Sequence, residues 1–130
     1  MKLLLDTHAM LWWWTAPERL PPKALSLMSD PSTGILASAV SAYELTYKNR
    51  LGKLQLPSSL LNQFERSVAD ERWTELQVST SHSLLAGRFA SDHRDPFDRL
   101  LAAQAIIEQA VLVTLDPAFE SFPEVERLWA

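Results

Sequence analysis

Short apolar segments that alternate with helix-like segments constrain the fold of this chain more than any other feature. Residues Lys2–Leu5, 34–37 and 111–114 are apolar runs of strand length, residues 73–78 are a further candidate, and a short edge strand is expected at 126–129. Runs of this kind between helices are typical of a parallel sheet that is covered on both faces. We therefore predict an α/β fold of three layers, with a central, mainly parallel sheet flanked by helices.

The segments between these strands carry helix signals. Ser41 and Glu44 have the S-x-x-E spacing of a capping box, so we place a helix start at Ser41 and its end at Gly52. Asp95 followed by Pro96 is a typical start for a long helix. The helices expected from these signals and from apolar periodicity cover residues 10–14, 21–29, 41–51, 58–69, 81–89 and 95–109.

Length and composition limit the class of protein. A chain of 130 residues with 47% hydrophobic and 22% charged residues fits one globular domain over residues 1–130. The net charge of −4 argues against a broad basic surface for nucleic acid, but not against an enzyme whose positive charge is a bound metal ion. The absence of cysteine suits a reducing compartment, and no apolar run approaches the roughly 20 residues of a membrane span. We expect a cytoplasmic protein with no membrane contact.

Two acidic residues follow candidate strands. Asp6 closes the first apolar run, and Asp116 comes just after the run at 111–114. In open parallel sheets, ligands bind beyond the carboxyl ends of the strands, which would place both carboxylates at a binding site. Either residue could instead only cap the structure that follows, because Asp is favoured at such positions.

Two more acidic residues lie on apolar stripes of predicted helices. Glu44 shares a stripe with Val40 and Tyr47, so it could point inward to meet a cation. It could also complete a capping box or pair with Lys48 at i+4. Asp98 lies in the first turn of its helix on a stripe with apolar residues, whereas the neighbouring Asp95 has the position of a simple N-cap.

Convergence of these four acids would require a cation. Two unit charges about 4 Å apart repel by roughly 4 kcal/mol at an effective dielectric constant near 20. Carboxylates brought together in one pocket must therefore take up protons or bind a positive ion. Oxygen ligands without thiolates select Mg²⁺, with Mn²⁺ as an alternative.

Four segments resemble the PIN-domain ribonucleases, and in particular the VapC-type toxins of type II toxin–antitoxin systems. They are LLLDTHAMLW, SAVSAYELTYKNRLGKL, HRDPFDRLLAAQA and LVTLDPAF, which cover residues 3–12, 38–54, 93–105 and 112–119. The resemblance implies a PIN-like fold, Mg²⁺-dependent endoribonuclease activity, an antitoxin partner and a homodimer. It also implies that the family's catalytic and metal-binding acids are Asp6, Glu44, Asp98 and Asp116, of which Asp6 and Asp98 would contact the metal most directly.

Three further residues could support this site. Thr114 stands in the T-x-D element before Asp116 and could orient that carboxylate or a water molecule. Asp95 adjoins the site as a cap, and His8 occupies a position where many members of the family carry asparagine. For His8, as for His93, a role as a polar loop residue is the alternative.

The expected substrate is single-stranded or looped RNA, since unstacked bases are what proteins read. Basic residues that could contact its phosphates are Lys48, Arg50, Lys53, Arg94 and Arg99. Each could equally be a solvated surface charge.

The run of Trp12, Trp13 and Trp14 cannot face one way on a helix. At least one should be exposed or lie in an interface, where the resemblance places the antitoxin. Core packing is the alternative for the others.

Two other functions compete with the nuclease. A catalytically silent PIN-fold interaction protein would share the fold without the chemistry. A phosphoacceptor signalling module would also place acids at strand ends, but it would need an acidic pair early in the chain and a lysine after a late strand.

Overall fold

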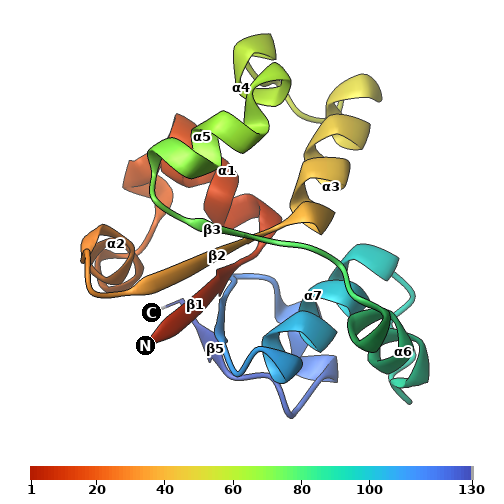
Figure 1. The fold of residues 1–130 in the computed structure, drawn as a ribbon. Coiled ribbons are helices and arrows are strands. Elements are labelled where there is room, and N and C mark those ends of the chain that lie inside the picture. Colours follow the sequence, from red (N-terminus) through yellow and green to blue (C-terminus); the bar gives the residue numbers. More distant parts are fainter. Residues whose placement is uncertain (130) are drawn as a thin grey trace.

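The computed structural model describes residues 1–129 and contains a five-stranded sheet in which every neighbouring pair of strands is parallel (Figure 1). The strands are β1 (Lys2–Leu5), β2 (Gly34–Ser38), β3 (Thr74–Leu76), β4 (Val111–Val113) and β5 (Arg127–Leu128). Their order across the sheet is β3-β2-β1-β4-β5. The direction in which strands are added therefore reverses at β1, which makes the carboxyl ends of β1 and β4 the switch point where open sheets of this class bind ligands.

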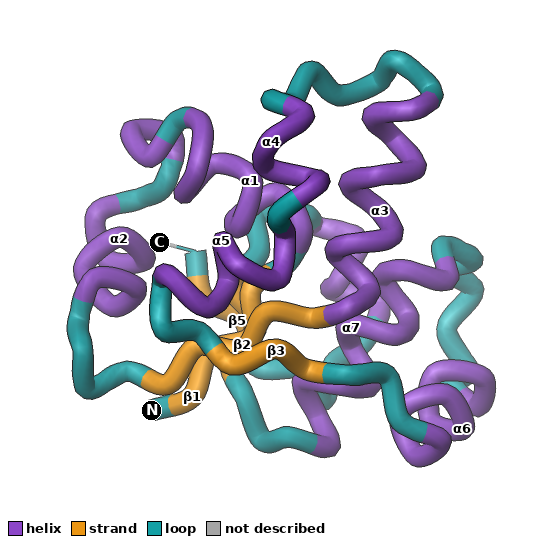
Figure 2. The backbone as a smooth tube through the Cα atoms, turned by 45° about the horizontal axis from the view of Figure 1, so that its top comes forward, coloured by secondary structure: helices purple, strands orange, loops and turns teal. Residues whose placement is uncertain are grey.

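Seven α-helices and two short 3₁₀-helices accompany the sheet within the described residues. They are α1 (Thr7–Thr15), η1 (Pro17–Arg19), α2 (Pro22–Ser29), α3 (Ala39–Arg50), α4 (Ser58–Asn62), α5 (Phe64–Asp70), α6 (Thr80–Arg88), α7 (Pro96–Ile107) and η2 (Pro117–Ser121). Figure 2 shows the strands side by side, with α1, α2 and α5 on one side and α6 and α7 on the other. The predicted three-layer α/β fold is confirmed.

The alternation of side chains along β1 explains the three layers. Leu3 and Leu5 are fully buried in a core cluster with side chains of α1, α2 and α5. Leu4, which points the other way, is buried in a second cluster with side chains of α7 and η2. In register, Leu4 pairs with Leu36 of β2 and Leu112 of β4, so one row of leucines crosses the centre of the sheet.

The start of α3 differs from the prediction. Ser38, at the end of β2, is the N-cap, and its hydroxyl accepts a hydrogen bond of 3.0 Å from the Val40 amide. The N-cap lies three residues before the expected start at Ser41, because the strand runs directly into the helix. The predicted capping box of Ser41 and Glu44 is therefore wrong, and both side chains are buried in the helix interior. Its end near Gly52 is confirmed, where a φ of +75° favours glycine.

Two other predicted helices also differ in their bounds. The helix expected over 58–69 is two helices, α4 and α5, separated at Gln63, whose φ of −122° and ψ of 33° leave the helical region. The break turns Phe64 and Val68 of α5 into the core, whereas α4 buries no residue. The first helix is longer than predicted and starts at Thr7, because Asp6 caps it. No helix within residues 1–129 combines the length and the apolar character needed to cross a bilayer.

Candidate active site

Asp6 lies directly after β1 and is the N-cap of α1. Its Oδ1 accepts a hydrogen bond of 2.7 Å from the Ala9 amide, and its own amide donates to the Val113 carbonyl of β4 at 3.1 Å. The side chain is only 5% exposed. Burial raises the pKa of Asp6 to about 6, against hydrogen bonds from Thr114 and Ala9 that lower it, and the charges of Glu44 and Asp116 raise it further. Asp6 is thus both a cap and a member of an acidic group.

Asp116 follows β4 on the neighbouring strand. Its amide donates to the Thr114 hydroxyl at 3.1 Å, and its Oδ1 accepts from the Ala118 amide at 2.9 Å, which caps η2. The Asp116 carboxylate is exposed, whereas Thr114 is buried. The Thr114 hydroxyl therefore contacts the turn that carries Asp116 and also acts on Asp6. Thr114 therefore links the two strand-end acids: it accepts a hydrogen bond from the Asp116 amide, and it lowers the pKa of Asp6.

Glu44 reaches the site from the middle of α3. It is 5% exposed, and its Oε1 accepts a hydrogen bond of 2.6 Å from the Thr7 hydroxyl. The Ser41 hydroxyl lies 3.1 Å from the same Thr7 oxygen, and the Lys48 ammonium group donates to Glu44 Oε2. Partial burial lowers the pKa of Lys48, but its hydrogen bond to Glu44 and the neighbouring carboxylates outweigh burial and raise that pKa. The predicted i+4 pair exists, and Glu44 also points inward.

Asp98 occupies the first turn of α7, behind the N-cap Asp95, whose Oδ1 accepts from the Phe97 amide at 2.8 Å. The Oδ2 atom of Asp98 lies 2.7 Å from His93 Nε2. Burial raises the pKa of Asp98 to about 6; the hydrogen bond from His93 lowers it, and the charges of Asp95, Asp116 and Glu44 raise it.

Four acids from four segments of the chain therefore act on one another electrostatically. Asp6 is influenced by Glu44 and Asp116, and Asp98 by Asp116 and Glu44. As the side chains stand, no three His, Asp or Glu residues within residues 1–129 are close enough to hold one metal ion. Glu44 and Asp98 are instead held by protein donors. The donor set, all carboxylate oxygens with two raised pKa values, still has the chemistry that a hard divalent cation would satisfy.

A cavity of about 280 Å³ adjoins the strand-end acids. Asp6 and Asp116 line it together with His8, Trp12, Leu115 and Pro117. His8 is exposed there, and its ring lies 5.7 Å from that of Trp12. His8 therefore shares the cavity with Asp6 and Asp116 and packs against Trp12.

The three tryptophans divide between two surroundings. Trp13 and Trp14 contact Trp73, with ring centroids 6.0 and 5.4 Å apart, while Trp12 contacts Trp129 at 5.5 Å. All three are half-buried against the core cluster of α1, α2 and α5. None is fully exposed, because their neighbours cover part of each ring.

The basic residues proposed from the sequence have different surroundings. The Arg99 guanidinium donates to the carbonyls of Ala86, Phe89, Ser91 and His93 at 2.8 to 3.0 Å, so it holds the loop before α7. Arg94 is exposed and lines a cavity of about 440 Å³ together with His93 and Arg99. These contacts favour Arg94 over Arg99 as a group that solvent or a ligand could reach.

Sequence analysis assigned no role to Thr7, only a capping role to Ser41 and no partner to His93, although each contacts an acid of the site or the partner of one. A buried carboxylate needs donors, and small hydroxyl residues beside Asp6 and on the helix turn before Glu44 were a signal that could have indicated them. His93 lies in an irregular loop, so its approach to Asp98 had no such signal.

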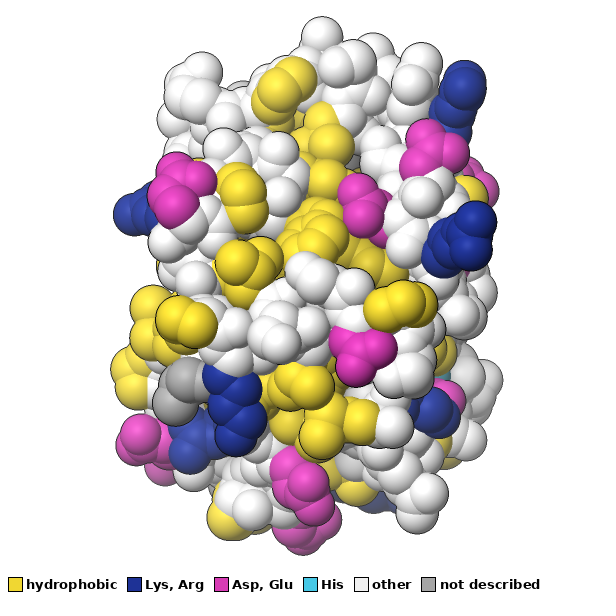
Figure 3. Space-filling view, turned by 90° about the vertical axis from the view of Figure 1, so that its left-hand side faces the viewer, with side chains coloured by type: hydrophobic (Ala, Val, Ile, Leu, Met, Phe, Trp, Pro, Cys, Tyr) yellow, Lys and Arg dark blue, Asp and Glu magenta, His cyan; other side chains and the backbone are white. Residues whose placement is uncertain are grey.

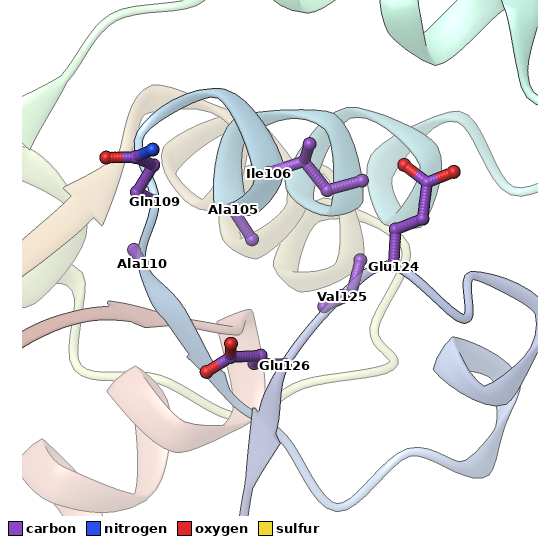
Figure 4. A pocket seen from close by; sticks show the side chains of 7 residues that line it. All are labelled: Ala105, Ile106, Gln109, Ala110, Glu124, Val125 and Glu126. Carbon is purple, nitrogen blue, oxygen red and sulfur yellow. The ribbon is translucent and has the colours of Figure 1, made fainter.

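A separate cavity of about 280 Å³ lies between the end of α7 and the segment before β5 (Figure 4). Gln109, Glu124 and Glu126 contribute its polar groups. Because it is also lined by Ala110, just before β4, it lies at the amino ends of the strands. It is therefore at the opposite edge of the sheet from Asp6 and Asp116.

The parallel sheet with acids beyond its central strands defines the class of protein. Residues 3–125 match the PIN domain family, and the chain belongs to it. It is also distantly homologous to Ribonuclease VapC22 of Mycobacterium tuberculosis, with 29% identity over 129 residues that cover 98% of each protein. The resemblance predicted from sequence segments is confirmed at the level of the family.

Solved structures have the same fold. VapBC2 from Rickettsia felis, bound to a DNA fragment from its promoter, matches with a TM-score of 0.73 and 20% identity over 100% of each chain. DNA-bound VapBC from Salmonella typhimurium matches with a TM-score of 0.73 and 21% identity over 98% of this chain and 97% of that one. A toxin–antitoxin complex from Klebsiella pneumoniae gives 0.60 and 14%, over 95% and 94%.

Proposed function

We propose that this chain is a metal-dependent endoribonuclease that cleaves RNA phosphodiester bonds and acts as the toxin of a toxin–antitoxin pair. The observation that carries the proposal is the electrostatic coupling of Asp6, Glu44, Asp98 and Asp116 at the switch point of the sheet. Membership of the PIN domain family and the distant homology to a ribonuclease support it.

The residues present fit Mg²⁺, or Mn²⁺ in its place. Asp6 and Asp98 would contact the ion directly, and Glu44 and Asp116 would complete the site directly or through water. Asp6 is buried and Asp98 half-buried, and the raised pKa of about 6 of each shows that their surroundings disfavour the ionised form, which a bound cation would stabilise. When bound, the ion would shield the scissile phosphate and lower the pKa of a water molecule that serves as nucleophile.

The chain's own residues keep these carboxylates in place. The Thr7 hydroxyl holds one oxygen of Glu44, and Thr114 acts on both strand-end acids. Lys48 contacts Glu44, and His93 contacts Asp98. Each of them stabilises the ionised form of its carboxylate when no metal ion is bound. Lys48 and the exposed Arg94 could then face RNA phosphates.

The partners proposed are an antitoxin protein and a second copy of this chain. The names of the structural relatives, VapBC and a toxin–antitoxin complex, support an antitoxin. Figure 3 views the molecule from the side on which α2 lies and shows hydrophobic side chains gathered at the centre of that face. The half-buried tryptophans of α1 belong to the core cluster beneath this side, so we place the antitoxin contact there.

The nuclease is tested with purified protein and a labelled single-stranded RNA. Cleavage should require Mg²⁺ or Mn²⁺, stop with EDTA, and be lost in Asp6→Asn. Asp70→Asn, which changes an exposed acid at the end of α5, is the matched control and should cleave like the unchanged chain. Metal-dependent cleavage by a folded Asp6→Asn protein at the unchanged rate would remove Asp6 from the site.

The toxin role is tested in cells. Expression of the chain should arrest growth, and Asp6→Asn should relieve the arrest. A small DNA-binding protein encoded just upstream should co-purify with the chain and restore growth when both are expressed. Growth arrest that persists in Asp6→Asn would separate toxicity from nuclease activity.

A further inference from the structure

An exposed aromatic patch lies beside the acidic site. It consists of Tyr43 and Tyr47 of α3 and Phe97 of α7, and we call it the aromatic patch. The ring of Tyr43 is 5.4 Å from that of Phe97 and 6.0 Å from that of Tyr47, and Tyr47 and Phe97 are 6.5 Å apart. The tyrosine side chains are 64% and 39% exposed. Large aromatic side chains with this much free surface need an explanation outside the core.

The position of the patch ties it to the candidate site. Tyr43 directly precedes Glu44, and Phe97 directly precedes Asp98. Successive residues of a helix point about 100° apart, so Glu44 is turned inward while Tyr43 faces outward. Phe97 is half-buried, with part of its ring against the core and part beside the tyrosines. The helices α3 and α7 pack against each other, which brings the two halves of the patch together. The rings therefore line the approach to Glu44 and Asp98.

A cationic side chain lies against one ring of the aromatic patch. The Arg50 guanidinium lies 5.5 Å from the centre of the Tyr47 ring, and Lys48 carries its ammonium group on the same helix. Lys48 is paired with Glu44, so Arg50 is the cation that the structure places against a ring of the patch. Aromatic rings with interspersed cations are the features with which proteins hold unpaired bases and the backbone that joins them.

We infer that the aromatic patch stacks an unpaired base of the RNA strand next to the cleaved phosphate, an inference that rests on the proposed function. The exposed tyrosine rings lie on successive turns of the helix that carries Glu44, and the Arg50 guanidinium lies against one of them, which favours a base beside the cleaved phosphate over a second protein. Stacking uses the face that all four bases share. The patch therefore selects single-stranded over double-stranded RNA and tolerates any base.

Binding, rather than cleavage, tests this inference. A fluorescently labelled 12-nucleotide single-stranded RNA is titrated with Asp6→Asn protein in Mg²⁺, so that the strand stays intact. Adding Tyr43→Ala should weaken binding by about tenfold, Tyr43→Phe should retain it, and Tyr47→Ala should weaken it in the same direction. Leu84→Ala on α6 removes an exposed apolar side chain away from the patch and should leave binding unchanged. An RNA duplex should bind weakly to every variant.

Each other outcome overturns the inference. Equal RNA affinity of Tyr43→Ala and Tyr43→Phe, or no measurable binding of single strands, would exclude a stacking role. A change in molar mass by light scattering in Tyr43→Ala, without a change in RNA affinity, would make the patch an interface between copies of the chain. The proposed function fails on a different measurement, namely the absence of metal-dependent cleavage by the unchanged chain.

Discussion

The Thr7 hydroxyl donates a hydrogen bond of 2.6 Å to Glu44 Oε1, across 37 positions of sequence and inside the protein. Thr7 is the first residue of the helix that Asp6 caps, so this bond joins the strand-end acid to the helix that carries Glu44. Both side chains are buried, and a buried carboxylate that loses a donor is costly.

Substitution Thr7→Val should test this bond because it keeps the shape of the side chain and removes the hydroxyl. We expect a loss of about 1–3 kcal/mol in the free energy of unfolding, as one oxygen of Glu44 loses its donor. RNA cleavage should also fall, and a higher Mg²⁺ concentration should be needed for half-maximal rate. Thr7→Ser retains the hydroxyl and should restore the metal dependence. Equal metal dependence in Thr7→Val and the unchanged chain would show that Thr7 does not position Glu44.

Stability should depend on pH through Asp6. Burial raises the pKa of Asp6 to about 6, above the ordinary value of 3.8. Between these values the folded protein keeps a proton that the unfolded chain has released, so the free energy of unfolding falls as pH rises from about 4 to about 6 and then levels off. Asp6→Asn removes this titration and still caps α1. Relative to that variant, the metal-free chain should lose up to about 3 kcal/mol over this range.

Urea unfolding of both proteins at intervals between pH 4 and 7, in EDTA, measures this difference. Parallel stability curves for the unchanged chain and Asp6→Asn would contradict a raised pKa at this position.

Added Mg²⁺ should stabilise the folded chain. An ion that binds only the folded state at ten times its dissociation constant raises the free energy of unfolding by about 1.4 kcal/mol. The gain should be present above pH 6 and decline below it, because protons then compete with the ion for Asp6 and Asp98. Asp98→Asn should abolish the gain, whereas Asp70→Asn should keep it. Thermal unfolding with Mg²⁺ and with EDTA gives the answer, and an equal gain in Asp98→Asn would count against the site.

His93 should set the pH at which activity appears. Its hydrogen bond lowers the pKa of Asp98, which burial has raised to about 6. Removing the ring in His93→Ala should raise that pKa, so the acid limb of the cleavage rate should move to higher pH. His93→Gln keeps an amide donor and should give a smaller displacement. Rates measured between pH 5 and 8 would refute the assignment if the midpoint were the same in all three proteins.

The sequence by itself determined much of the fold. The strands at Lys2–Leu5 and near residues 34–37 could be predicted because each is a short apolar run bounded by polar residues. Such a run is typical of a strand buried on both faces. The start of α7 could be predicted because Asp95 and Pro96 together are a typical N-cap and first residue of a helix. The start of α3 was not, since Ser38 and Ser41 offer the same local chemistry and only the strand before Ser38 selects the cap.

For the site, the sequence determined which groups carry charge and on which element each one lies. Asp6 and Asp116 could be placed at strand ends, and Glu44 and Asp98 on inward helix stripes. Only the tertiary structure decided that Thr7 holds Glu44, that His93 reaches Asp98, and that the Arg99 guanidinium is used on loop carbonyls. Helix capping and apolar periodicity depend on residues that are only a few positions apart, so the sequence specifies them directly. Burial and the repulsion between distant carboxylates depend on how the elements pack, and no local pattern specifies that.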